Sequence, residues 1–595
     1  MEYHVALNGS GKSGGSRFDP FQTISAAAHA AQPGDVIVVH AGVYRERVNP
    51  PRGGRSDAER IVYQAAPGEH VEIKGSEIVK GWVSLRGDTW TLTLPNSFFG
   101  TFNPYRDLLH GDWFAPQGRQ HHSGAVYLNG DWLLEAATLD DVIQPAGQAP
   151  LWFARVDEAE TTLWAQFKDA NPNEALVEIN VRQAVLYPEK PGLDFITVRG
   201  FKLSQAATPW APPTAEQIGL VGTHWSRGWV IEDNVISHSR CVGVTLGKYG
   251  DEFDNKSESA DAYNRTIERA LASGWSKDAV GSHVVRNNHI SHCEQAGIVG
   301  SLGAVFSVIE NNHIHDIHVQ RLFAGAEQAG IKLHAAIDVQ ITGNHIHHAV
   351  RGIWLDWMAQ GTRLSRNVLH DNAEEDLYVE VDHGPYLVDN NLLLSKVSLK
   401  NWSQGGAFAH NLFAGAVISQ DYDERTTPFL KPHSTEVAGL HDNPGGDDRF
   451  YNNVFVGASG LKAYDTARLP VWLEGNVFLG GAGVSRHEAD PLHIPQLGTA
   501  PTLEANADGF ALAVDLDAAW TSGRRRERVT TARLGTTVIS GQRYENADGT
   551  PLVVHLDYFG RERGETDPVP GPFEQRGSGR VIVRLGRETR VPIPP

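Results

Sequence analysis

Apolar residues recur along this chain in short runs, and each run begins just after an asparagine. The runs include VRNNHI, IENNHI, LSRNVL and VDNNLL. The asparagines of two neighbouring pairs, Asn288 with Asn312 and Asn367 with Asn391, are each 24 positions apart. A fixed period of strand-like residues with a recurring turn residue predicts a solenoid. We therefore expect an all-β chain built on a right-handed parallel β-helix.

The recurring asparagines suit two tasks in such a fold. Asparagine tolerates the left-handed backbone of a tight turn. Stacked asparagine side chains can also hydrogen-bond from one coil to the next. We expect these residues to form the turns and to stack on one another.

Breaks in the repeat divide the chain into four parts. Residues 1–74 hold an Ala-rich amphipathic segment, FQTISAAAHAA, which predicts a capping helix over the first coils. Residues 75–193 carry longer alternating strands such as GAVYLNGDWLLE, which predict an inserted β-sandwich. The main helix spans 194–490 and contains a helical excursion, SADAYNRTIERALASGW. In 491–595 the repeat is lost. There TTARLGTTVI, PLVVHLDYF and GRVIVRL predict strands of a C-terminal β segment, which we expect to pack on the flanking sandwich.

Charge and composition narrow the possible partners. The formal net charge is −19, from 71 acidic and 52 basic residues, which disfavours nucleic acid and polyuronates as ligands. No apolar run reaches membrane length, and the N-terminus, MEYHVALNGS, lacks the features of a signal peptide. The two cysteines, Cys241 and Cys293, cannot form a disulfide framework, and we interpret them as buried thiols. We expect a cytoplasmic protein with no membrane contact.

A second recurring element aligns the coils and brings chemistry together. It reads GIVGS, GIKLH and GIWLD, and the next coil has DLYVE in the same register. The fifth positions are Ser301, His334, Asp356 and Glu380. Neighbouring strands lie about 4.8 Å apart, so this register predicts an imidazole and two carboxylates stacked on one face.

Two carboxylates one coil apart are typical of glycoside hydrolysis. A carboxyl separation of about 5 Å fits a retaining enzyme, whereas an inverting enzyme needs roughly 6.5–9.5 Å. Like charges at this distance push the two pKa values apart, which leaves one group as the acid and the other as base or nucleophile. Trp354 and Trp357 flank Asp356, and aromatic faces suit sugar rings. Carboxylates that merely accept hydrogen bonds from turn amides are the alternative, and we favour the catalytic interpretation.

Histidines are frequent just after the turn asparagines. His289, His313, His315, His345, His347 and His348 all stand there. Because they follow the repeat and match no zinc-binding spacing, we interpret them as turn or surface residues. We expect no metal site and no cofactor.

Several irregular segments carry aromatic and polar residues that suit the walls of a sugar pocket. They hold Trp113 in HGDWF, Trp210 in ATPWAPPTAEQ, Glu327 in AGAEQAG and His383 in DHGPYL. Such segments favour a closed pocket over an open groove, and so favour an enzyme that acts on chain ends. We expect these four residues, with His334 and Trp357, to contact the substrate.

The motifs PNSFFGTFNPY, ATPWAPPTA, GIKLHAAIDVQI, WLDWMAQGTR and VEVDHGPYLVD resemble those of glycoside hydrolase family 120 β-xylosidases. The resemblance extends from residue 1 to about residue 480. It implies a right-handed β-helix with a flanking β-sandwich, and a homo-oligomeric enzyme that releases xylose from the non-reducing end of xylo-oligosaccharides with retention. It also implies that Asp356 is the nucleophile and Glu380 the acid/base.

Two other functions remain open at this point. A β-helix polygalacturonase or polysaccharide lyase would act on uronates, and a lyase would need calcium. A non-catalytic β-helix sugar-binding protein would bind sugars without releasing a product.

Overall fold

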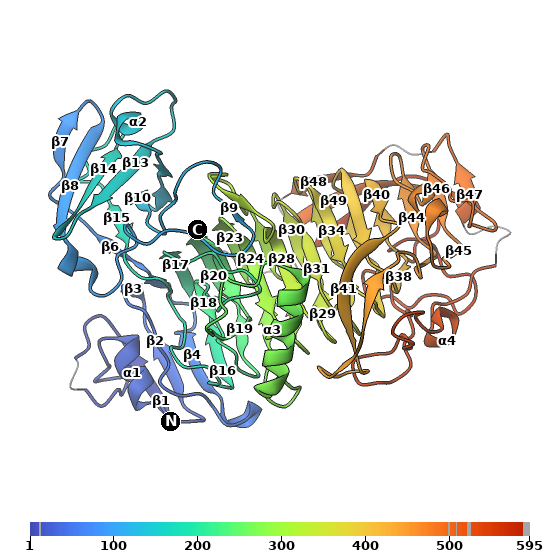
Figure 1. The fold of residues 1–595 in the computed structure, drawn as a ribbon, viewed down its shortest axis with the longest axis horizontal. Helices are drawn as coiled ribbons and strands as arrows, with labels where there is room; N and C mark the ends of the chain where they lie inside the picture. The colour runs from blue at the N-terminus through green and yellow to red at the C-terminus, as the bar shows by residue number, and fades with distance from the viewer. Residues whose placement is uncertain (11–12, 498–499, 507–508, 521–524, 587–595) are drawn as a thin grey trace. The chain divides into compact units, whose positions relative to one another are not determined.

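The computed structural model describes residues 1–10, 13–497, 500–506, 509–520 and 525–586. The chain divides into two compact units. Unit 1 comprises Met1–Glu258, His289–Val299 and Asp316–Gln328, and unit 2 comprises Ser259–Asn288, Gly300–His315 and Ala329–Pro595. Figure 1 shows the strands and helices of both units.

Unit 1 begins with parallel strands under a helical cap. The strands pair in the order β1 (Glu2–Val5), β2 (Val36–Val39), β4 (Ile61–Ala65), β16 (Ile196–Arg199) and β19 (Val230–Glu232). Helix α1 (Ile24–Ala30) packs on β1 and β2. It begins where the Thr23 side chain accepts a hydrogen bond from the Ala26 N–H, which satisfies a free donor of the first turn. The helix expected from the Ala-rich segment is therefore confirmed.

The insert in unit 1 consists of two sheets that are mainly antiparallel. One has the order β12 (Leu134–Glu135), β13 (Leu151–Val156), β14 (Glu160–Gln166), β8 (Thr89–Pro95), β7 (Val83–Arg86), and the other β11 (Asp131–Trp132), β10 (Val126–Leu128), β15 (Val177–Asn180), β6 (Ser76–Ile78). Both sheets contribute to one core, which includes Leu92, Trp152, Val126 and Ile179. Two sheets around a shared core form a β-sandwich, as expected from the alternating strands.

Three parallel sheets make up the described coils of unit 2. The first contains β25 (Val308–Glu310), β29 (Gln340–Thr342), β32 (Arg363–Ser365), β35 (Tyr386–Asp389) and β38 (Gly406–Ala409). The second contains β26 (His313–His315), β30 (His345–His347), β33 (Val368–His370) and β36 (Leu392–Leu393). The third contains β28 (Ala329–His334), β31 (Ile353–Asp356), β34 (Glu375–Glu380), β37 (Val397–Trp402) and β40 (Ala416–Ser419). Successive coils from β25 to β40 add one strand to each sheet, and the later coils extend only the first two sheets, so the predicted parallel β-helix is confirmed.

The recurring asparagines of unit 2 form a continuous buried ladder. At Asn367, the backbone N–H and the side-chain Nδ2 both donate to Asn391 Oδ1 at 2.9 Å. The same Nδ2 also donates to the carbonyl of Ile341, 2.9 Å away. The pattern repeats along the coils and ends at Asn476, which donates to the carboxylate of Glu488. The expected stacking is therefore confirmed, with the side-chain amides satisfied inside the coil.

The left-handed turn position, however, is not the ladder asparagine itself. It is the residue before it, for example Asn311 (φ 55°), Arg366 (φ 57°) and Asn390 (φ 58°). The ladder asparagines do lie in the turns, as Asn367 does between β32 and β33, but the left-handed conformation expected of them belongs to the preceding residue. A ladder asparagine must point its amide inward along the stack, so the preceding residue makes the bend.

The C-terminal segment packs on the coils of unit 2. Strands β48 (Thr502–Asn506), β49 (Gly509–Leu516) and β50 (Gly579–Gly586) form an antiparallel sheet. Leu512, Val514 and Val583 share a core with Leu392 and Val454 of the coils. This contact differs from the one expected from the sequence, and the expected packing on the flanking sandwich stays a prediction.

Of the three strands expected here, GRVIVRL becomes β50, but TTARLGTTVI begins with the short helix α4 (Thr531–Leu534). The Thr530 side chain accepts a hydrogen bond from the Arg533 N–H, which caps a helical turn at this position. PLVVHLDYF forms isolated bridges only.

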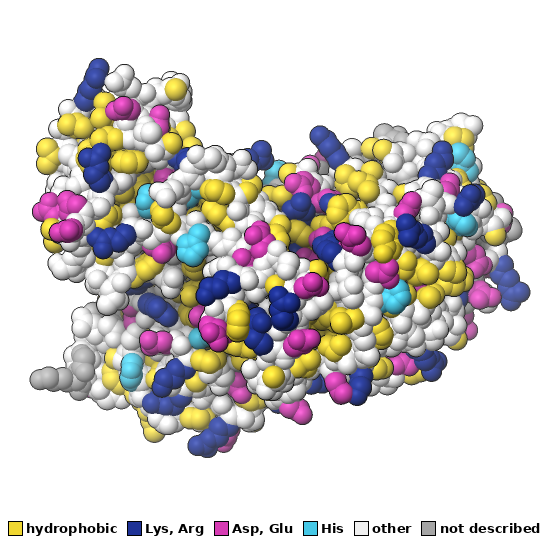
Figure 2. Space-filling model, viewed as in Figure 1, with side chains coloured by type: hydrophobic (Ala, Val, Ile, Leu, Met, Phe, Trp, Pro, Cys, Tyr) yellow, Lys and Arg dark blue, Asp and Glu magenta, His cyan; other side chains and the backbone are white. Residues whose placement is uncertain are grey.

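The cysteines and the helical excursion also have the structure that the sequence predicts. Cys241 and Cys293 are buried free thiols, as expected. The helical excursion becomes α3 (Ala260–Ala272). No helix within the described ranges has the length and apolar character needed to cross a bilayer. Figure 2 shows Lys and Arg side chains interspersed with Asp and Glu on the face in view, without a continuous basic patch.

Candidate active site

Two rows of side chains cross the outer face of the third sheet of unit 2. One row follows the pairing Lys332, Trp354, Tyr378, Lys400, and the other follows His334, Asp356, Glu380, Trp402. Between them Leu333, Leu355 and Val379 are completely buried. Because side chains alternate along a strand, both rows lie on the opposite face from this core. The register that the sequence predicts for His334, Asp356 and Glu380 is confirmed.

Asp356 lies in a buried, positively charged environment. Its Oδ2 is 2.5 Å from Lys332 Nζ and 3.2 Å from His334 Nε2. Burial alone would raise the pKa of Asp356, but the positive charges of Lys332 and His334 outweigh burial and lower this pKa. Its Oδ1 receives no hydrogen bond from the part of the chain that the structure describes. The geometry therefore favours an ionised carboxylate with one oxygen available for attack.

Glu380 is directly paired with Asp356 on the next coil and is 8 % exposed. Its Oε1 is 2.8 Å from Arg425 Nη2. Burial and the negative charge of Asp356 raise the pKa of Glu380, and Arg425 only partly opposes them. The pKa values of this neighbouring pair are therefore shifted in opposite directions, that of Asp356 down and that of Glu380 up.

Arg425 comes from a hairpin outside the regular coils. Strands β41 (Asp423–Leu430) and β42 (Val437–Asn443) pair antiparallel after β40. The Asp423 carboxylate holds the Arg425 guanidinium through Nε and Nη2 at 2.9 and 2.8 Å. The sequence gives no period or motif that would place this arginine beside Glu380.

Lys332 was also missed, although the sequence contains a signal for it. In GIKLH, Lys332 stands two positions before His334 and therefore shares its face. Its Nζ lies 3.1 Å from the centroid of the Trp354 ring, which stacks on Tyr378 at 4.8 Å. The aromatic pair therefore supports the cation that neutralises Asp356.

Trp357 lies at the end of β31 and is 5 % exposed. Its Nε1 donates to Asn264 Oδ1 at 3.3 Å, and its ring is 5.4 Å from that of Tyr263. Tyr263 also packs edge-on against His334, with ring centroids 5.1 Å apart. Helix α3, the excursion from the coils, thus contributes two residues to this region that the sequence did not single out.

His383 is held by the hairpin that carries Arg425. Its Nε2 is 2.8 Å from Thr427 Oγ1, and its Nδ1 hydrogen-bonds with Gln404. The side chain is 2 % exposed, and burial lowers its pKa to about 4. These contacts give the neutral ring a structural role in the hairpin, and its expected contact with substrate stays a prediction.

Three further predicted substrate contacts lie in unit 1. Trp210 is 2 % exposed, and its Nε1 donates to the Asp112 carbonyl at 3.0 Å. Trp113 has a left-handed backbone (φ 57°), and its N–H donates to Glu258 Oε1 at 3.0 Å. Glu327 is buried. Their roles in binding substrate stay predictions.

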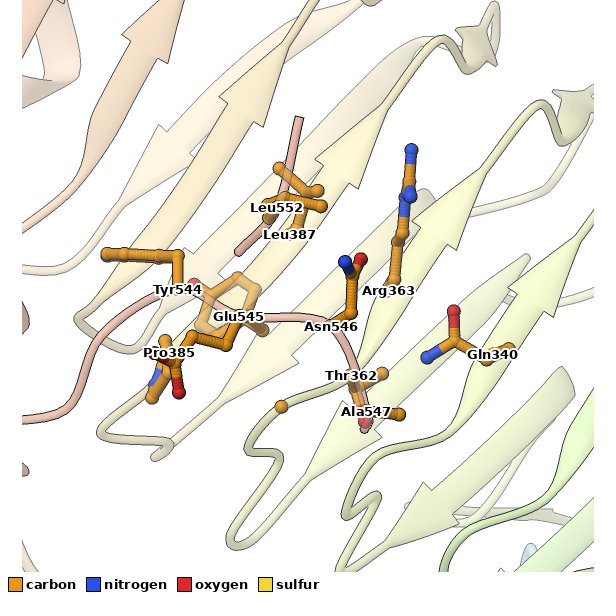
Figure 3. A pocket seen from close by; sticks show the side chains of 12 residues that line it. Gln340, Thr362, Arg363, Pro385, Leu387, Tyr544, Glu545, Asn546, Ala547 and Leu552 are labelled. Atoms are coloured by element: carbon orange, nitrogen blue, oxygen red, sulfur yellow. The ribbon is translucent and has the colours of Figure 1, made fainter. Parts of the chain in front are cut away.

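A separate hollow of about 330 Å³ in unit 2 does not contain the carboxylates. It is lined by strands of the first sheet and by part of the C-terminal segment. Figure 3 shows the segment with Tyr544, Glu545 and Asn546 running across the strands that carry Arg363 and Gln340. Asp356 and Glu380 belong to the third sheet, so this hollow is not the candidate active site.

Comparison with known families and structures adds independent findings. Residues 79–151 match the model for the glycoside hydrolase 120 insertion domain, and residues 218–415 match the right-handed β-helix region. No curated protein matches the sequence. A solved structure described as "The complex structure of XylC with xylose" is 40 % identical, covers 98 % of this chain and 100 % of its own, and has a TM-score of 0.94.

More distant structures share much less. One described as "Glycoside hydrolase" is 11 % identical, covers 84 % of this chain and 97 % of its own, and has a TM-score of 0.44. Pectate lyase Pel9A is 10 % identical, covers 97 % of this chain and 96 % of its own, and has a TM-score of 0.36. At these identities and TM-scores, neither structure supports an inference about the function of this chain.

Proposed function

Because this chain belongs to glycoside hydrolase family 120, we propose that it is a retaining β-xylosidase that releases xylose from the non-reducing end of xylo-oligosaccharides. The main support for a retaining mechanism is the direct pairing of Asp356 with Glu380. The pKa values of these two carboxyl groups shift in opposite directions. The similarity to XylC, a protein solved with xylose, supports the choice of sugar.

The spacing of the two strands supports retention. Residues paired across neighbouring parallel strands lie about 4.8 Å apart, which is close to the roughly 5 Å between the carboxyl groups of retaining enzymes. An inverting enzyme needs roughly 6.5–9.5 Å, because a water molecule must fit between its base and the sugar.

In the first step, an oxygen of Asp356 forms a bond to the anomeric carbon while the bond to the leaving oxygen breaks. Glu380 gives its proton to that leaving oxygen. Lys332 and His334 favour this step because they keep Asp356 anionic before the attack.

In the second step, Glu380 takes a proton from water, the water oxygen attacks the anomeric carbon, and Asp356 leaves as a carboxylate. Once Asp356 is esterified it carries no charge, so one of the causes that raises the pKa of Glu380 disappears. Arg425 remains beside Glu380 and stabilises its ionised form. The same glutamate can therefore act first as acid and then as base.

Two measurements test the proposal. Aryl glycosides of xylose, arabinose, glucose and galactose define the sugar, and we expect the β-xyloside to be cleaved fastest. NMR of the first product from a β-xyloside defines the stereochemistry, and we expect β-xylose. An initial α-xylose product would rule out retention, and no cleavage of any β-pentoside would rule out the proposed activity.

The mode of attack is tested on natural oligosaccharides. We expect stepwise release of xylose from xylobiose and xylotriose. Random internal cleavage of xylan with little free xylose would contradict action on chain ends. The cytoplasmic location and the homo-oligomeric assembly expected from the sequence stay predictions, to be tested by cell fractionation and light scattering.

A further inference from the structure

Histidines from successive coils gather on the outer face of the second sheet of unit 2. Strands β26 and β30 pair so that His313 lies beside His345 and His315 beside His347, and His347 in turn pairs with His370 of β33. The residues between them along each strand are buried in the core, namely Ile314, Ile346 and Leu369. Alternation therefore places the imidazoles on the opposite face, away from the core.

The ring nitrogens of this cluster are already close together. His313 Nε2 is 2.9 Å from His347 Nε2, and His345 Nε2 is 2.7 Å from His370 Nε2. One ring nitrogen from each of His313, His345 and His347 lies within 4.8 Å of the other two. Zinc–nitrogen bonds of about 2.0–2.1 Å put neighbouring nitrogens of a tetrahedral site about 3.3 Å apart. Small side-chain rotations would therefore bring three nitrogens around one ion.

The surroundings also orient the rings. His370 Nδ1 is 2.6 Å from Asp371 Oδ2, and this contact holds the His370 ring beside His345. His347 Nδ1 likewise contacts His348 Nδ1 at 2.6 Å, which directs its Nε2 inward.

We propose that His313, His345 and His347 bind one divalent transition-metal ion such as Zn²⁺, Ni²⁺ or Cu²⁺. Neutral imidazole suits this class of ion, whereas Ca²⁺ and Mg²⁺ prefer oxygen ligands. From the sequence alone, these histidines are interpreted as turn or surface residues, because their spacing matches no zinc-binding motif. The stacking of the coils nevertheless brings their ring nitrogens together, and the proposal rests on this contact.

The position of the site indicates a structural role. Its ligands belong to two successive coils, so a bound ion would link β26 to β30. The ring of Phe510, in β49 of the C-terminal sheet, lies 4.4 Å from that of His345 and covers one side of the cluster. The catalytic carboxylates lie on another sheet, so we expect metal binding to change stability and not the hydrolytic rate.

The test uses the full chain without a polyhistidine tag, after treatment with a chelator. Calorimetric titration with Zn²⁺ should show one equivalent bound at pH 7.5 and weaker binding at pH 5.5, because the ligands must be unprotonated. Zn²⁺ should also raise the melting temperature. Co²⁺ in place of Zn²⁺ should give the intense visible absorption of a tetrahedral complex.

Variants locate the site. His313→Ala, His345→Ala and His347→Ala each remove one proposed ligand and should each weaken Zn²⁺ binding by at least tenfold. His555→Ala, which removes an exposed histidine outside the cluster, should bind as the parent does. Hydrolysis of an aryl glycoside shows that each variant is folded. Binding that is absent in the parent, or equal in all four variants, would overturn the proposal.

Discussion

Lys332 and Asp356 form a buried ion pair across neighbouring strands, with Lys332 Nζ 2.5 Å from Asp356 Oδ2. Burial raises the pKa of Asp356, and Lys332 is the largest of the charges that lower it. If Lys332 were absent, His334 would be the main charge left to oppose burial, so this pKa would rise. In the proposed mechanism Asp356 must be anionic to attack. In that mechanism Lys332 would act on catalysis through the charge of Asp356.

Lys332→Met tests this relationship. The pKa of Asp356 should rise, so the acid limb of the pH profile of kcat/KM should move to higher pH, and the maximal rate should fall by roughly 10²-fold. Lys400→Met is the matched control, since Lys400 lies in the same row but pairs with Glu375 at 3.3 Å. An acid limb that stays in place in Lys332→Met would show that Lys332 does not set this charge.

Glu380→Ala should retain part of its activity on an aryl xyloside with an acidic phenol, because such a leaving group needs little protonation. The glycosyl-enzyme then lacks a base to activate water, so a burst of phenol should appear. Added azide should restore turnover and give the β-xylosyl azide, identified by NMR. A variant that is equally slow on good and poor leaving groups, with no azide product, would contradict the role of Glu380 as acid/base.

Asp356→Ala removes the covalent route, and no leaving group should restore it. We expect a loss on the order of 10⁴-fold or more in kcat on every substrate. Azide could at most attack the sugar directly and give the α product. If this variant kept most of its activity on activated substrates while Glu380→Ala lost it, the two roles would be reversed.

Arg425→Met should affect the other limb of the pH profile. Arg425 lowers the pKa of Glu380, so its removal should raise that pKa further and move the alkaline limb to higher pH. The ionised glutamate needed in the second step becomes less available, so the covalent intermediate should accumulate, which mass spectrometry would detect. Arg543→Met changes an exposed arginine and should leave the profile unchanged. An unchanged alkaline limb in Arg425→Met would refute this role.

Asn391→Ala should destabilise unit 2. The side chain accepts hydrogen bonds from Asn367 and donates to the Leu364 carbonyl and to Asn411 Oδ1, all in the buried ladder. Leaving these groups unsatisfied costs about 1–3 kcal/mol each, so the free energy of unfolding should fall by about 3 kcal/mol or more. Denaturant unfolding measures it, with the exposed Asn8→Ala as control. A loss below about 0.5 kcal/mol would mean that the ladder contributes little.

Much of this architecture can be predicted from the sequence because the solenoid repeats its interactions at a fixed spacing. The asparagine period locates the coils, and the GI motif places His334, Asp356 and Glu380 in register. Lys332 could have been found by the same alternation along the strand. These inferences need only local geometry and the distance between coils.

Residues outside the repeat could not be predicted in this way. Arg425 reaches Glu380 from a hairpin, and Tyr263 reaches His334 from a helix, and neither element has a spacing tied to the coils. At TTARLGTTVI the β-branched residues favour a strand, but the capping contact of Thr530 starts a helical turn instead. In each case a specific side-chain contact decided the outcome.

The origin of Arg425 has a consequence for how such an enzyme can diversify. Asp356, the proposed nucleophile, is neutralised mainly by Lys332 and His334, which belong to strand β28 of the coils. Glu380, the proposed acid/base, receives its counter-ion from an appended hairpin between β40 and the following coil. Exchange of that hairpin would therefore change the charge beside Glu380, and with it the working pH range, while the coils that carry Asp356 stay intact.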